Sequence, residues 1–486
     1  MPLKPRNNSR KVREEGNSRA GSYAVVVNVV ELLLRVVQLE MDEKVLIIAV
    51  YVAGLLSQTN ITMTAIAENV GVVTHDQLNW MLNNLSIKLS WAAVRGVKLV
   101  ETLGLEGALI IDDVLLPKPF SKAIAYCGWD WDHSSKRNVY GQRLVFIVWR
   151  SDYLIIPLLF AIWQKDPHKT PRAKNKGRGR KRKRGRKIID HSARALKRRR
   201  TYQLKRQQQQ KAKLRRKRLT NGVHVRSKNE LARIMVWKLV RAGIKSKYVL
   251  FDNWYGSKHN VLLFERLKLY WVTRSKENSK VNCTKEIENQ QLKPTELNVK
   301  QLGETIPKAH YHYYAKLGAR LRSFVVIMSC RPVLLTVIKD DRSQEAGTTK
   351  YLLTNALWLT NQQVVAWYRK RWAIEVFFRD AKQHLGLTKC QARTPQAIIN
   401  HIFLVCLAYM ILQLLKPLTP QPRPSIKHSQ YAIACLLVFV QHNRRQLVRP
   451  LSDGSFSPIS LLSLLSPART RLKLLEHPLS SFVSYS

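Results

Sequence analysis

Two continuous apolar runs that end in aspartate constrain the fold of this chain more than any other feature. The first is ALIIDD, at residues 108–113, and the second is YVLFDNWYGS, which carries Asp252. Apolar runs without alternation are typical of strands that are covered on both faces. Between these runs, residues 227–243 have the apolar spacing and terminal glycine of a helix. We therefore expect a mixed or parallel sheet with helices on its faces.

The remaining segments divide the chain into regions of different character. Residues 22–104 have helical spacing, and a turn at Gly71 followed by a helix opening at Thr74 has the spacing of a helix-turn-helix, which either contacts DNA or only packs. Residues 277–356 are short segments rich in β-branched and aromatic residues, which predicts a mainly β unit. Apolar helices are predicted at 397–416 and 426–446, before a tail.

The charge of the chain points to a polyanionic partner. It has 83 Lys and Arg against 32 Asp and Glu, a net charge of +51, and nucleic acid is the obvious partner. Residues 172–218 alone hold 24 Lys and Arg against one acid, Asp190. This segment is expected to follow phosphates, although a nuclear-type address and an inert charged loop remain alternatives. The rest of the chain stays basic without it.

The cysteines and the apolar runs indicate the compartment. The six cysteines form no C-x-x-C pair, which predicts neither a zinc ribbon nor a disulfide framework and suits a reducing cytoplasm. The basic start of the chain has no apolar core behind it, and the longest apolar runs fall short of a membrane span. No signal peptide and no membrane helix are predicted.

A polar stripe follows one predicted helix. On a helix over residues 362–384, Tyr368, Arg371, Glu375 and Lys382 fall within about 60° of arc, beside an apolar face that would pack on the sheet. A surface helix often carries such a stripe, so the pattern alone leaves catalysis and simple solvation both open.

Carboxylates at strand ends, with a glutamate beside the same sheet, are what a two-metal phosphoryl-transfer site needs. Their hard oxygen ligands favour Mg²⁺ or Mn²⁺ over zinc. An aspartate after a strand is also a common turn former or helix cap, so a structural role remains the alternative for each acid taken singly.

Taken together, the motifs LIIDD, FDNWYGS, YWVTRSK and YRKRWAIEVFFRDAKQHLGL resemble the bacterial DDE transposases of insertion sequences, in the branch named after insertion sequence four. That branch carries the signature Y-x2-R-x3-E-x6-K, which residues 368–382 match in full. The resemblance covers roughly residues 105–415. Many relatives follow the first acid pair with threonine, where this chain has Val114.

The resemblance implies an α/β fold, in which a ribonuclease H-like catalytic domain with a mainly β insertion is flanked by helical N-terminal and C-terminal regions. The implied domains are a helical DNA-binding region (1–104), the first part of the core with a basic arm at 165–226 (105–276), the β-rich insertion (277–358), the closing core helices that carry the glutamate (359–416), and a helical C-terminal region and tail (417–486).

The resemblance also implies roles for particular residues. Two Mg²⁺ or Mn²⁺ ions would be held by Asp112, Asp252 and Glu375, with Asp113 as the substitute for Asp112. DNA phosphates would be contacted by Tyr368, Arg371, Lys382, Arg274 and Lys276. Trp254 is expected to pack rather than to stack on a base.

The implied activity is cleavage of transposon-end DNA and its joining to target DNA by metal-dependent phosphoryl transfer. A homodimer on DNA is expected, in the bacterial cytoplasm and associated with the nucleoid, with no membrane partner. A metal-dependent nuclease without strand transfer, a nucleic-acid binder without activity and a decayed copy of a mobile element remain the alternatives.

Overall fold

The computed structural model describes residues 45–57, 61–70, 73–85, 94, 96–98, 100–101, 104–119, 123–164, 201, 226–283, 297–328, 331–340 and 349–415. The helix predicted at 426–446, the tail and, apart from Thr201, the basic segment 172–218 lie outside these residues. The chain divides into two units, one of residues 163–227 and the other of residues 1–162 and 228–486. The elements named below belong to the second unit, apart from the last residue of β4.

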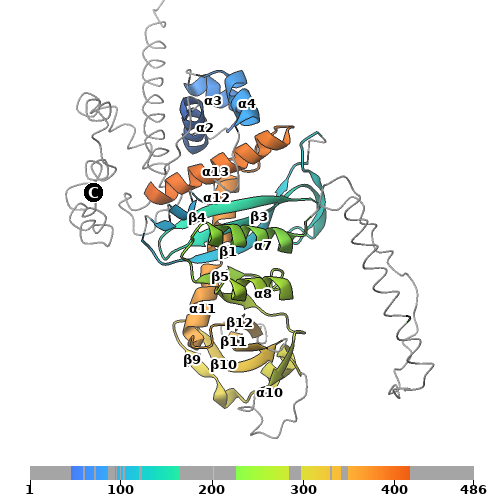
Figure 1. The fold of residues 1–486 in the computed structure, drawn as a ribbon. Coiled ribbons are helices and arrows are strands. Elements are labelled where there is room, and N and C mark those ends of the chain that lie inside the picture. The colour runs from blue at the N-terminus through green and yellow to red at the C-terminus, as the bar shows by residue number, and fades with distance from the viewer. Residues whose placement is uncertain are drawn as a thin grey trace, which may run out of the picture. The chain divides into compact units, whose positions relative to one another are not determined.

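One large sheet organises the described part of this unit (Figure 1). Its 12 strands have the order β2-β3-β1-β5-β6-β12-β11-β10-β7-β8, with β4 paired to β3 and β9 paired to β10. The strands are β1 (Ala108–Pro117), β2 (Gly128–Asp132), β3 (Arg137–Arg150), β4 (Ile155–Trp163), β5 (Tyr248–Phe251), β6 (Tyr270–Arg274), β7 (Lys280–Cys283), β8 (Leu297–Asn298), β9 (His312–Tyr314), β10 (Ala319–Met328), β11 (Arg331–Asp340) and β12 (Thr349–Thr354).

Three neighbouring strands, β1, β5 and β6, run parallel. The apolar residues of β1 from Ala108 to Ile111 and those of β5 from Val249 to Phe251 are fully buried. This confirms the expectation that unalternated apolar runs form strands covered on both faces. The helix predicted before the second run is also present, as α7 (Lys228–Arg241), and α8 (Lys258–Arg266) follows that run.

The β-rich stretch continues the same sheet. Strand β12 pairs antiparallel with β6, and β11, β10 and β7 follow from it in sequence across the sheet. Two short helical elements, α10 (Val299–Thr305) and η1 (Lys308–His310), accompany these strands. The expected strands are therefore present, joined by hydrogen bonds to the strands that carry the acids.

The N-terminal part of the described chain is helical. It consists of α2 (Val45–Ser57), α3 (Met63–Val70) and α4 (His75–Asn84). Thr74 caps α4, because its hydroxyl accepts from the backbone of Gln77 while the Gln77 side chain returns to the Thr74 backbone. The predicted opening of a helix at Thr74 is confirmed, and α4 packs on α13 (Pro395–Leu415).

The segment with the signature spacing is two helices rather than the single one predicted over 362–384. Helix α11 (Asn361–Lys370) ends before Arg371, and α12 (Ala373–His384) begins after Trp372. Around this break the backbone bonds join residues three apart, from Arg371 to Tyr368 and from Glu375 to Trp372. Such bonds wind the chain more tightly than an α-helix, so a constant angle per residue fails here.

Aromatic packing fixes α12 against the sheet. The rings of Phe377 and Phe378 lie 5.3 and 5.5 Å from that of Phe146 on β3, in edge-to-face contacts. Behind α12 lies α13 (Pro395–Leu415), which is apolar on all sides. Among the described residues, it is the one helix long and apolar enough to cross a membrane, whereas the sequence predicted no such helix. Most of it is buried inside the protein, as in a core helix.

Candidate active site

Two of the predicted acids lie side by side where the parallel pairing of β1 with β5 ends. Ile111 of β1 is in register with Phe251 of β5, so the residues that follow, Asp112 and Asp252, lie at the same edge of this pairing. Asp252 comes directly after β5, but Asp112 does not end its strand as the sequence predicted, because β1 continues to Pro117. Phe251 is in turn in register with Thr273 of β6, which brings Arg274 to this edge as well. Polar groups at the carboxyl ends of adjacent parallel strands are a common site for ligands in α/β folds.

The guanidinium of Arg371 joins the third predicted acid to the first. Its Nη1 lies 2.7 Å from Oδ2 of Asp112, and its Nη2 lies 2.5 Å from Oε1 of Glu375. Arg371 stands at the break between α11 and α12, so its side chain reaches the sheet edge, while Glu375 is in the first turn of α12. Arg371 therefore bonds two of the three predicted acids, and its charge also lowers the pKa of the third, Asp252.

The other predicted DNA contacts are only partly gathered here. The ring of Tyr368 lies 5.8 Å from the Arg371 guanidinium, and the charge of Arg274 also acts on its hydroxyl. Lys276 is exposed beyond β6. Lys382 is near Asp132 and Arg143, on the β2–β3 side of the sheet rather than around Arg371.

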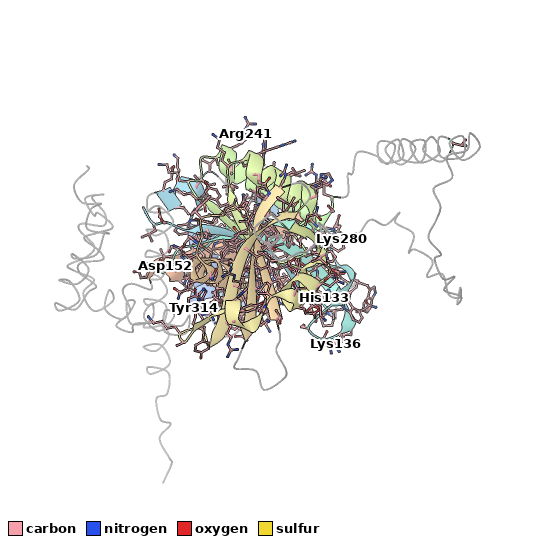
Figure 2. All side chains as sticks on the ribbon, turned by 90° about the horizontal axis from the view of Figure 1, so that it is seen from below. His133, Lys136, Asp152, Arg241, Lys280 and Tyr314 are labelled. Atoms are coloured by element: carbon pink, nitrogen blue, oxygen red, sulfur yellow. The ribbon has the colours of Figure 1, made fainter. Side chains whose placement is uncertain are left out.

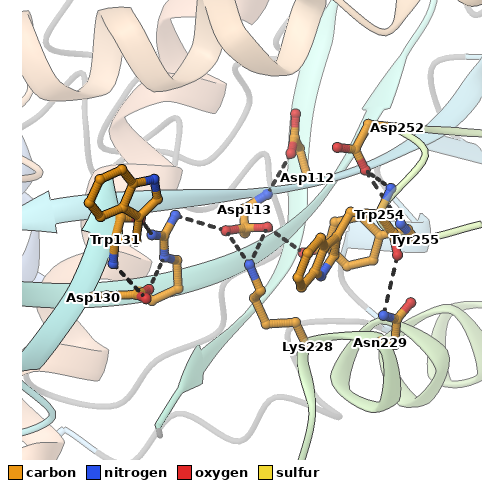
Figure 3. Close-up of polar contacts among 10 residues, drawn as sticks. Asp112, Asp113, Asp130, Trp131, Lys228, Asn229, Asp252, Trp254 and Tyr255 are labelled. Carbon is orange, nitrogen blue, oxygen red and sulfur yellow. Dashed lines mark hydrogen bonds and ion pairs between the residues drawn. The ribbon is translucent and has the colours of Figure 1, made fainter. Parts of the chain in front are cut away.

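Asp113 points to the other side of β1 and has different partners (Figure 3). Its carboxylate accepts from Arg143 at 3.0 Å, from Lys228 at 3.0 and 3.1 Å, and from the hydroxyl of Tyr255 at 2.9 Å. Successive side chains of a strand point to opposite faces, which separates the two acids of the pair. No local sequence motif marks Arg143, Lys228 or Tyr255 as partners of Asp113, so these contacts could not be predicted.

Burial shapes the protonation of the acids at the edge. It raises the pKa of Asp112 to about 7; the Arg371 charge opposes this shift, and the nearby Asp252 and Asp113 charges add to it. Burial also raises the pKa of Asp252, against two backbone N–H groups that donate to its carboxylate. Ionisable groups whose pKa is shifted by burial cluster at functional sites.

The donor set at this edge suits a hard divalent cation. Asp112 and Asp252 present carboxylate oxygens from adjacent strands, and Mg²⁺ and Mn²⁺ prefer oxygen ligands. In the part of the chain that the structure describes, no three or more His, Cys, Asp or Glu side chains stand together as a ready metal-binding group. The guanidinium of Arg371 lies between Asp112 and Glu375 instead.

The mixed α/β fold with its large sheet is consistent with the DDE nucleases of the ribonuclease H-like superfamily. The family described as "DDE superfamily endonuclease" matches residues 41–295, more than half of the chain. A second family, "Transposase DDE domain", matches residues 214–411. The chain therefore belongs to the DDE superfamily of endonucleases. The first match contains Asp112 and Asp252, and the second contains Asp252 and Glu375.

Two relatives are named as transposases. One, for insertion sequence element IS5377 of Geobacillus stearothermophilus, is 34% identical over 62 residues, which are 13% of this chain and 16% of the relative. The other, y4zB of Sinorhizobium fredii, is 31% identical over 102 residues, 21% of this chain and 27% of the relative. The chain thus matches well under a third of the length of either relative.

Proposed function

We propose that this protein is an insertion-sequence transposase that cleaves the ends of its element and joins them to target DNA by metal-dependent phosphoryl transfer. The observation that carries the proposal is that Arg371 bonds both Asp112 and Glu375, while Asp252 follows the strand residue paired with the neighbour of Asp112. Membership in the DDE superfamily and the two relatives named as transposases support it. The signature spacing at residues 368–382 favours the branch named after insertion sequence four.

In the proposed site, Asp112, Asp252 and Glu375 would hold two Mg²⁺ or Mn²⁺ ions. When bound, the ions would supply activation of the attacking oxygen and stabilisation of the leaving oxygen of a phosphodiester. Asp112 takes this role rather than Asp113, because Asp112 is on the side of Asp252 while Asp113 is already bound by two cations and a phenol. Arg371 releases Asp112 and Glu375 when it turns to a DNA phosphate.

The residues around the acids orient the DNA. Arg371 and Arg274 supply charged donors for phosphate oxygens, and Tyr368 adds a phenolic donor. Lys276 extends this surface along the strand end, and Lys382 contacts DNA on the β2–β3 side of the sheet. Residues 45–85, which include the helix-turn-helix, contain no Lys or Arg. Phosphate binding by that motif would lack cations, so the sheet edge and the basic segment bear most of this task.

The proposed cleavage and joining of DNA ends imply an assembly of two subunits. Two ends of an element are cut and joined together, so two active sites work in one complex, and a homodimer on DNA is proposed. The domain division is proposed as residues 1–104, 105–276, 277–358, 359–416 and 417–486, with the strands of 277–358 as an insertion before the glutamate helix. The protein acts in the bacterial cytoplasm on nucleoid DNA.

The test is a joining reaction with the matched variant Glu375→Gln. Protein, Mg²⁺ and DNA that carries the inverted repeats flanking this coding region are incubated with a target plasmid. Wild-type protein is expected to yield joined products, whereas Glu375→Gln is expected to bind DNA and yield neither cleaved nor joined DNA. Glu304→Gln, at an exposed glutamate of α10, is the control and is expected to behave as wild type.

The outcomes separate the competing functions. Cleavage without joined products would support a nuclease, and DNA binding without any cleavage by wild type would support a decayed or non-enzymatic copy. Magnesium-dependent cleavage by folded Glu375→Gln would remove Glu375 from the site.

A further inference from the structure

The carboxylate of Asp113 is the centre of a network that joins four elements of the fold. Its donors come from Arg143 on β3, Lys228 at the start of α7 and Tyr255 after β5. Arg143 continues the network to β2, where its Nε donates to Asp130 at 2.7 Å. Figure 3 shows Lys228 and Tyr255 bonded to Asp113.

Stability alone does not account for such a network. The side chain of Asp113 is only 10% exposed and those of Arg143 and Lys228 are 12% and 16% exposed, so all three have lost most of their hydration. Removing charges from water costs free energy that the ion pairs often only offset, and apolar residues of similar size can stabilise a core as well. The geometry of the network is therefore its more informative property.

That geometry connects the two acids of the sheet edge. The backbone N–H of Asp113 donates to Oδ1 of Asp112 at 2.8 Å. Tyr255 contacts both sides, since its backbone N–H donates to Oδ1 of Asp252 at 3.4 Å and its hydroxyl donates to Asp113 at 2.9 Å. A chain of bonds thus runs from Asp112 through Asp113 and Tyr255 to Asp252.

We propose that Asp113 and Tyr255 are positioning residues that hold Asp112 and Asp252 at a fixed spacing and thereby set the affinity of the acid pair for divalent cations. This inference rests on the proposed function. Neither residue touches the substrate; each acts through the acid that it orients. Replacing a residue that orients a metal ligand commonly lowers both metal affinity and activity.

Tyr255→Phe tests the inference with the loss of one oxygen atom. The ring of Tyr255 is fully buried, and phenylalanine keeps its packing, so the variant is expected to fold. Tyr311→Phe is the matched control, because Tyr311 is also buried and its hydroxyl donates to the carbonyl of Gly303, in the β-rich part of the chain. Each protein is titrated with Mn²⁺ by calorimetry without DNA and assayed for cleavage of end DNA at varied Mg²⁺.

Tyr255→Phe is expected to weaken Mn²⁺ binding by roughly 10–100-fold and to raise the Mg²⁺ concentration needed for half-maximal cleavage, while Tyr311→Phe changes neither. A merely structural role would lower the melting temperature of both variants and leave the metal dependence alone. Asp113→Asn is expected to act in the same direction as Tyr255→Phe. Its control is Asp132→Asn, at an acid of β2 that is bonded to Ser134 and Ser135.

The failures of the two proposals can be told apart. If wild type cleaves end DNA and Tyr255→Phe matches Tyr311→Phe in both titrations, the positioning role is wrong and the transposase proposal stands. If wild type does not cleave but binds Mn²⁺, and Tyr255→Phe weakens that binding, the positioning role stands without the activity. Wild-type protein that binds no Mn²⁺ contradicts both.

Discussion

Two regions of this protein bury ionisable groups, and the partners of these groups differ between the regions. At the sheet edge, Asp112 and Glu375 share the guanidinium of Arg371, and burial is the largest cause that raises the pKa of Asp112 to about 7. The second region, here called the helical junction, consists of Tyr51, Lys118, Gly386, His401 and the backbone carbonyls of 388 and 390. It lies where α2, α13 and the end of α12 meet.

The ionisable side chains of the helical junction form hydrogen bonds with neutral groups. Lys118 donates to the carbonyls of Thr388 and Cys390 at 2.7 and 2.6 Å, and His401 bridges the hydroxyl of Tyr51 and the carbonyl of Gly386. Burial lowers the pKa of His401 to about 4, which keeps its ring neutral at neutral pH. The named groups of the junction are hydrogen-bonded to each other, whereas burial at the sheet edge leaves the carboxyl of Asp112 with a raised pKa. This contrast supports the proposal that the edge carries the chemistry and that the junction stabilises the fold.

Arg371→Gln should produce the largest change, and it acts on the edge. The substitution removes the one cation bonded to both Asp112 and Glu375 and the donor proposed for a phosphate. Single-turnover cleavage of end DNA is expected to fall by roughly 10²–10³-fold, as when a transition-state donor is lost. Circular dichroism is expected to show a folded protein.

The control for Arg371→Gln is the neighbouring cation. Lys370 pairs with the exposed Asp152 at 2.7 Å, so Lys370→Gln removes an ion pair at the surface and is expected to cleave near the wild-type rate. Without DNA, Arg371→Gln is expected to bind Mn²⁺ at least as tightly as wild type, because no guanidinium then occupies the acids. Unchanged cleavage by Arg371→Gln would contradict the proposed difference in function between the sheet edge and the helical junction.

Sequence patterns predicted the parts of the edge that depend on local order. Apolar runs located β1 and β5, and the acids that end them lie in register because parallel strands of equal burial align. The apolar spacing around Phe377 and Phe378 correctly predicted the packing of α12 on the sheet. Burial requires a regular pattern of apolar residues in the sequence, and these features could be predicted from that pattern.

Other features depend on contacts between distant residues and produce no such pattern. The partners of Asp113 lie 30, 115 and 142 residues away from it, and nothing local distinguishes Arg143 from any other strand residue. The break at Arg371 follows neither a glycine nor a proline, so a single helix was the natural but wrong prediction. The choice between Asp112 and Asp113 likewise needed the partners on each face of β1.

Lys118→Met should have an intermediate effect, confined to the junction. It removes the Lys118 donor from two part-buried carbonyls, which costs at most about 1–3 kcal/mol each and lowers the free energy of unfolding accordingly. Urea denaturation measures this loss, and Lys245→Met, at an exposed lysine paired with Glu101, is the control with little effect. Cleavage per folded molecule is expected to stay near wild type. A folded Lys118→Met protein with no cleavage would show that the junction does more than support the site.

His401 should give the smallest effect, seen as a pH dependence of stability. Because its pKa is about 4 in the folded protein and about 6.5 when unfolded, the unfolded chain binds more protons between these values, and stability falls as pH falls through that window. From pH 7 to 5.5 this amounts to about 1 kcal/mol. His401→Gln is expected to lose that part of the slope in urea titrations without DNA or metal, whereas His133→Gln, at an exposed histidine of the β2–β3 turn (Figure 2), retains it. Equal slopes for wild type and His401→Gln would show that the junction does not hold His401 neutral. The junction would then not be the purely structural region described above.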